Sequence, residues 1–89
     1  MNQQLCTIDK EKVVWRTVEG EAVILNLEDG LYYTLNETGS RVWEKLAVGK
    51  GADEIAHHMA AQFGIEPARA QEDTIELIAQ LKKAKLVES

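Results

Sequence analysis

Side chains that could act as nucleophiles or metal ligands are few in this sequence and widely spaced. The one cysteine, Cys6, has no histidine nearby to activate it, and a single thiol builds neither a disulfide framework nor a metal site. His57 and His58 are adjacent, and neighbours on a helix point about 100° apart, so they do not readily share a metal ion. The serines, Ser40 and Ser89, lie outside any nucleophile motif. We expect surface histidines and an inert thiol.

The sequence also contains no motif for phosphate binding and no acidic residues that are best explained by acid–base catalysis. The run Gly49-Lys50-Gly51 is too short for a phosphate-binding loop, and it follows a helical pattern where such a loop would follow a strand. Glu21, Glu28, Asp29 and Glu37 all lie at turns or helix starts, where solvation or capping explains them. We therefore expect a protein that is not an enzyme and that uses no cofactor and no metal.

The composition limits the classes of partner. The chain has 89 residues, with 10 basic against 15 acidic side chains, a net charge of -5 and a pI of about 4.9. Binding to a duplex needs a basic face, so this balance argues against nucleic acid and favours a basic partner. No apolar run approaches the length that spans a membrane, and no signal segment opens the sequence. We expect one cytoplasmic domain over residues 1–89, with residues 1–10 mobile and no membrane contact.

The first half of the chain has the pattern of strands. Residues 13–18 are rich in β-branched and aromatic types, and residues 21–27 alternate, with Val23, Leu25 and Leu27 on one face. Gly20 separates these two runs, and Glu28-Asp29-Gly30 forms the next turn. Residues 31–35 follow, with Leu31, Tyr33 and Leu35 on one face and Tyr32 and Thr34 on the other. The pattern predicts a three-stranded antiparallel meander.

The second half has helical periodicity. Asn36 is suited to cap a first helix, which carries Gly39, Val42, Trp43 and Leu46 at helical spacing. A second helix places its apolar stripe at Ala52, Ile55, Ala56, Met59, Ala60 and Phe63, and Gly64 ends it. Pro67 suits the first turn of a third helix, whose core stripe is Ala70, Thr74, Leu77, Ile78 and Leu81. With Leu86 and Val87 packed back, the order predicts an α+β fold of the winged-helix-turn-helix type.

An open sheet of three strands leaves an edge whose free N–H and C=O groups must be protected or used. Tyr32 and Tyr33 are either β-forming residues that are buried or half-exposed, or residues on or beside that edge which accept another strand. Polar residues follow one side of Leu77 on the third helix: Asp73, Glu76 and Gln80. Small or apolar residues follow its other side: Ala68, Ile75 and Ala79. Which of these two sides faces the third strand stays open on the sequence alone.

Residues 25–43 resemble the PqqD-like family. The resemblance rests on an apolar strand, the acidic turn ending at Gly30, the run Tyr32-Tyr33-Thr34-Leu35-Asn36, Gly39, and the pair Val42-Trp43. Later residues that fit the family's helices extend it over about residues 13–88: Glu54-Ile55, Pro67, Asp73-Thr74, Leu77-Ile78, Leu81 and Lys85-Leu86-Val87.

The resemblance implies a peptide-recognition element for ribosomally made, post-translationally modified peptides. The leader segment of a precursor would add a strand to the third strand and lie against the third helix, with alternate side chains in pockets. The residues expected to bind it are Leu27, Leu31, Tyr32, Tyr33, Thr34, Asp73, Glu76, Leu77 and Gln80. Leu27, Tyr33 and Leu77 would supply apolar pockets, and Asp73 and Glu76 would pair a basic residue.

A short chain of this style is most similar to the stand-alone leader-binding protein of lasso peptide biosynthesis. That similarity implies partnership with a leader peptidase of the cysteine protease type and with a cyclase. A second copy could form a homodimer through the open strand edge. Two alternatives stay open: a peptide chaperone in pyrroloquinoline quinone synthesis, and a winged-helix DNA-binding domain.

Overall fold

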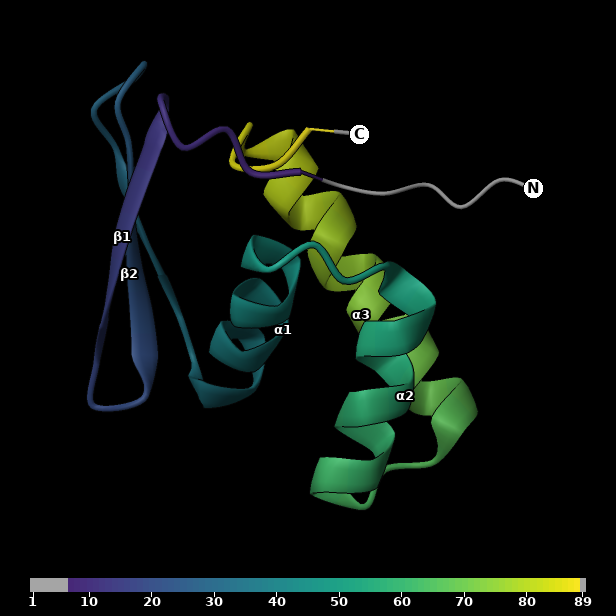
Figure 1. Ribbon diagram of the computed structural model, residues 1–89. Coiled ribbons are helices and arrows are strands. Elements are labelled where there is room, and N and C mark those ends of the chain that lie inside the picture. The colour runs from purple at the N-terminus through teal and green to yellow at the C-terminus, as the bar shows by residue number, and fades with distance from the viewer. Residues whose placement is uncertain (1–6, 89) are drawn as a thin grey trace.

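The computed structural model describes residues 7–88 and contains two layers, a three-stranded sheet and three helices that cover one of its faces (Figure 1). The elements follow the predicted order: β1 (Val13–Val18), β2 (Glu21–Asn26), β3 (Tyr32–Leu35), α1 (Glu37–Ala47), α2 (Ala52–Phe63) and α3 (Pro67–Lys83). The predicted α+β class, with three antiparallel strands followed by three helices, is confirmed.

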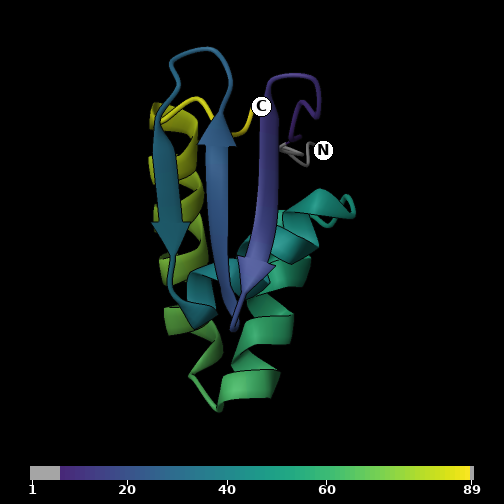
Figure 2. The same ribbon diagram turned by 90° about the vertical axis from the view of Figure 1, so that its left-hand side faces the viewer.

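The sheet is an antiparallel meander with β2 in the centre (Figure 2). Glu19 and Gly20 both have positive φ, at 52° and 84°, as the two central residues of a tight hairpin turn require. The second turn ends at Gly30, whose φ is 74°, and Asn26 N–H donates to the Leu31 carbonyl across it at 3.0 Å. Both β1 and β3 are therefore edge strands.

The buried face of β2 differs from the face that its apolar alternation suggested. Ala22, Ile24 and Asn26 are buried beneath the helices, whereas Val23 and Leu25 lie half-buried on the outer face of the sheet. The helices decide which face of β2 is buried, because α1 packs against the face that carries Ala22. Asn26 thus occupies an inward position that a hydrophobic residue would normally take.

The predicted helix signals are present. The Asn36 side chain accepts a hydrogen bond from Gly39 N–H at 2.8 Å, which caps α1. Gly64 ends α2 in the left-handed conformation with φ of 66°, and Pro67 is in the first turn of α3. Phe63 departs from its predicted core position: it is 37% exposed, at the last residue of α2.

The core lies between the inner face of the sheet and the helices. Ile24, Trp43 and Ile55 are fully buried, and Trp15 contacts the Trp43 ring edge to face with centroids 5.3 Å apart. Leu86 and Val87 are also buried, so the tail packs back onto the domain as predicted.

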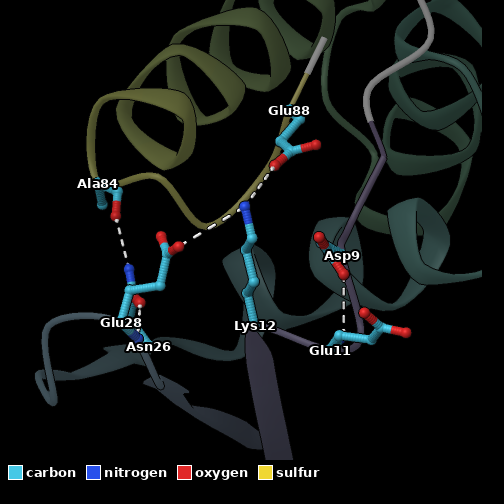
Figure 3. A network of polar contacts seen from close by, with 7 residues as sticks. All are labelled: Asp9, Glu11, Lys12, Asn26, Glu28, Ala84 and Glu88. Atoms are coloured by element: carbon cyan, nitrogen blue, oxygen red, sulfur yellow. Dashed lines mark hydrogen bonds and ion pairs between the residues drawn. The ribbon is translucent and has the colours of Figure 1, made fainter.

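The two ends of the described chain meet beside the turn between β2 and β3. Thr7 and Glu88 form an antiparallel bridge with backbone hydrogen bonds of 2.7 and 2.8 Å. Lys12 lies 3.6 Å from the Glu28 carboxylate and 3.9 Å from that of Glu88 (Figure 3). Mobility of residues 1–10 stays a prediction, and residues 1–6 lie outside the described part. Among the helices described, none is long and apolar enough to cross a bilayer.

Candidate functional site

The outer edge of β3 offers backbone groups for another strand. Consecutive residues of an antiparallel strand turn their N–H and C=O groups to opposite sides. The Leu31 carbonyl accepts from Asn26, so Leu31, Tyr33 and Leu35 face β2. The N–H and C=O groups of Tyr32 and Thr34 then point away from the sheet, and within residues 7–88 no strand pairs with them. We call these four groups the open edge.

Apolar side chains from β3 and α3 meet next to the start of α1, beneath the open edge. Tyr33 and Leu35 of β3 are half-buried and pack against the core, as does Leu77 of α3. Gly39 of α1 lies between them, since a Cβ there would be 3.4 Å from the Leu35 Cβ and 3.6 Å from Leu77 Cδ2. A Cβ at this position would make ordinary contacts with both side chains, and its tightest approach would be 3.3 Å to the capping oxygen of Asn36. Tyr33 and Leu77, predicted to form pockets, therefore share one apolar region.

Contacts of Leu77 and Gln71 indicate which side of α3 faces β3. The Leu77 side carries Asp73 and Gln80 at about 100° per residue, and Leu77 Cδ2 and Leu35 Cβ of β3 both lie within 4 Å of the position that a Cβ on Gly39 would take. On the opposite side, Gln71 donates to Asp53 of α2 at 3.3 Å. The side of α3 that carries Asp73 and Gln80 thus lies toward β3, and the side that carries Gln71 lies toward α2, with Ile75 and Ala79 exposed. Figure 2 shows α3 running alongside β3 behind the sheet.

The other residues expected at the site are more exposed. Tyr32 is 69% exposed on the outer face of the sheet, with Thr34 beside it. Leu27 and Leu31 lie exposed in and beside the turn before β3. Glu76 is about 100° around the helix from Leu77, which turns it further from β3 than Asp73. The expected set therefore falls into an inner apolar part, an outer exposed part and a polar helix flank.

The helix flank is acidic but not free of local pairing. Asp73 lies 3.5 Å from Arg69, one turn earlier on α3, and both side chains are more than half exposed. Such an exposed pair contributes about 0.5 kcal/mol, so a ligand cation can compete for the carboxylate.

Within residues 7–88 no three His, Cys, Asp or Glu side chains gather as a metal site would require. His57 and His58 are exposed, as predicted, and His58 lines a shallow hollow of about 530 Å³ between α1 and α2 with Arg41 and Lys45. Cys6 lies outside the described residues.

Two buried polar residues at the ends of β3 are missing from the expected set. Asn26 accepts from Glu28 N–H at 2.8 Å and donates to Ala84, and Ser40 accepts from Ala22 N–H at 2.7 Å and donates to the Leu35 carbonyl at 3.1 Å. For Asn26 the available signal was a polar residue at an inward strand position. Ser40 follows Gly39 on the inner face of a helix, a position that gives no signal without the strands it contacts.

The family is now decided by comparison. The model of the family described as coenzyme PQQ synthesis protein D (PqqD) matches residues 21–87, three quarters of the chain. The chain belongs to the PqqD family. This match includes β2, β3 and all three helices, so the whole candidate site lies inside the family domain. A search of the curated proteins returned no match.

Two solved structures resemble this PqqD-family chain over nearly its whole length. One is TbiB1 in complex with the TbiA(β) leader peptide, with a TM-score of 0.88 and 29% identity, covering 93% of this chain and 95% of that one. The other is a lasso peptide synthetase B1 complexed with the leader peptide, with a TM-score of 0.87, 19% identity and coverage of 97% and 100%. At that lower identity the second likeness shows the shared fold alone.

Proposed function

We propose that this PqqD-family chain binds the leader segment of a ribosomally made precursor peptide in lasso peptide biosynthesis, by strand addition at the open edge. The observation that carries the proposal is a β3 edge that no strand within residues 7–88 pairs, above an apolar region, in a fold shared with two proteins solved in complex with leader peptides. Backbone hydrogen bonds to Tyr32 and Thr34 supply affinity, and alternate side chains supply specificity.

The strand geometry defines what kind of segment fits. Side chains of an added strand alternate between the two faces of the sheet. Every second residue then points inward, toward Tyr33, Leu35 and Leu77, where an apolar side chain would be buried. The intervening residues lie on the outer face beside Tyr32 and Thr34. Asp73 and Gln80 favour a basic or hydrogen-bonding leader residue where the leader faces α3. Glu76, which is turned further from β3, would attract a basic leader residue from a longer distance.

Binding of the leader would serve to deliver the precursor peptide to other enzymes. We infer that the bound leader is presented to a separate leader peptidase of the cysteine protease type and to a cyclase, in the cytoplasm. In the absence of the peptide, the open edge could pair two copies of the chain.

A second candidate within the same binding mode is a peptide chaperone in pyrroloquinoline quinone synthesis. The description of the family model favours it. The genes beside this one discriminate the two: a small precursor with a protease and a cyclase supports the lasso pathway, and genes for quinone synthesis support the alternative.

Titration with a synthetic leader from the neighbouring precursor gene tests the proposal. We expect amide shifts in ¹⁵N-labelled protein to concentrate at Tyr32–Leu35 and along the Leu77 side of α3. Asp73→Arg should weaken binding about tenfold without unfolding the protein, because it places a cation where a basic leader residue would bind. Unchanged affinity of Asp73→Arg would remove this flank from the site.

Glu72→Arg is the matched control for that variant. It makes the same change in net charge one residue earlier on α3, at an exposed position turned away from β3. Arg69→Ala separately measures the cost of losing the Arg69–Asp73 pair. Equal weakening by Asp73→Arg and Glu72→Arg would mean that overall charge, and not the assigned flank, governs binding.

A further inference from the structure

Ser40 interrupts the ladder between β2 and β3 at its last pair. Ala22 and Leu35 are partners in the register, yet Ala22 N–H donates to the Ser40 hydroxyl at 2.7 Å, and that hydroxyl donates to the Leu35 carbonyl at 3.1 Å. The side chain, 1% exposed, therefore forms a bridge from α1 into the sheet. The C-terminal end of β3 is held by a helix as well as by β2.

Asn26 performs the corresponding task at the other end of β3. Its side-chain oxygen accepts from Glu28 N–H at 2.8 Å, which fixes the turn, and its amide donates to the Ala84 carbonyl at the end of α3 (Figure 3). The residue is 2% exposed. This contact joins the turn before β3 to the helix that lies alongside it.

β3 itself is short and weakly held. Its four residues alternate between exposed and half-buried, and its two inward side chains are only partly covered. A four-residue edge strand has few ladder hydrogen bonds, so its position relative to α3 depends on what holds its ends.

We propose that Asn26 and Ser40 are positioning residues that fix β3 at both ends and so set the spacing between the open edge and α3. The inference rests on the proposed function, because that spacing matters only if a strand docks there. Neither side chain reaches the open edge, since both are buried on the inner side. They act by preorganising the site, so that an incoming peptide does not bear the cost of ordering β3.

The test measures two quantities on each variant: amide hydrogen exchange of the free protein, and the dissociation constant for the leader of the neighbouring precursor gene. We expect Ser40→Ala and Asn26→Ala each to speed exchange at Tyr33 and Leu35 relative to the α2 amides. Each should raise the dissociation constant about tenfold. Ser40→Thr, which keeps the hydroxyl, should restore most of the affinity.

Ile55→Val is the control for a general loss of stability. Ile55 is fully buried in α2, far in sequence from β3. This change weakens the core but leaves the hydrogen bonds of Asn26 and Ser40 unaltered. If its denaturation midpoint equals that of the alanine variants, Ile55→Val should still bind with a dissociation constant within about twofold of the wild-type value. If Ser40→Ala does not fold, Ser40→Cys takes its place, since its thiol is a weaker hydrogen-bonding group of similar shape.

The outcomes separate this inference from the proposed function. Wild-type exchange rates at Tyr33 and Leu35 in both alanine variants, or affinity losses no greater than that of Ile55→Val, would overturn the positioning role. If the wild-type protein does not bind the leader at all, the proposed function is wrong. Exchange at β3 then still decides whether the two residues hold the strand.

Discussion

At the residue scale, Asn36 joins the strand that forms the candidate site to the helix beneath it. It follows Leu35 directly, and its side chain accepts from Gly39 N–H at 2.8 Å. Asn36→Ala should lower the free energy of unfolding by about 1 kcal/mol, because the first turn of α1 loses its capping acceptor. Urea denaturation followed by tryptophan fluorescence measures the change.

Asn36→Asp is the informative companion to that variant. A carboxylate caps as well as an amide and also favours the positive end of a helix, so stability should stay close to that of the wild type. A loss as large in Asn36→Asp as in Asn36→Ala would contradict the capping role.

At the element scale, the alternation of backbone groups along β3 makes a prediction that separates binding from folding. Thr34 N–H points to the open edge, and Tyr33 N–H points to β2. Thr34→Pro should therefore preserve the sheet, since proline is tolerated on an edge, yet weaken leader binding about tenfold or more by removing a donor and placing a ring in the docking path. Calorimetric titration measures the affinity, and circular dichroism the fold.

Tyr33→Pro and Thr34→Val complete that comparison. Tyr33→Pro removes a donor that faces β2 and should destabilise the sheet itself. Thr34→Val keeps the N–H group and should bind nearly as the wild type does. Full-strength binding by a folded Thr34→Pro variant would rule out strand addition at this edge.

At the scale of the whole molecule, net charge distinguishes peptide recognition from duplex binding in a fold of winged-helix type. With 15 acidic against 10 basic side chains, the chain as a whole repels phosphates. We expect no shift of a DNA duplex in a gel at low salt, where electrostatic binding is strongest. A shift that disappears as salt is raised would instead point to a basic patch, of which Arg41 and Lys45 beside the α1–α2 hollow are the nearest candidates.

Much of this protein follows from its sequence because the signals involved are local. Asn36 at a cap, Gly64 at a helix end and Gly30 in a turn each act on neighbours within a few residues, and period-2 and period-3.6 patterns mark strands and helices directly. The order of elements, the position of β3 at an edge and the stripe of α3 that contains Leu77 were predictable in this way. The resemblance to the family came from the same short stretches.

The tertiary structure alone decided the matters that depend on distant contacts. Apolar residues occur on both faces of β2, so the sequence does not say which face is buried. The packing of the helices against one face buries Ala22, Ile24 and Asn26. The side of α3 that faces β3 depends on contacts between residues far apart in the sequence. The Asn26–Ala84 hydrogen bond joins residues 58 apart, and the Ser40 bridge joins residues 18 apart. No periodicity records such pairings, because a side chain's identity does not specify which remote backbone group it will meet. The sequence therefore predicts an open edge, and the fold determines what stands beside it.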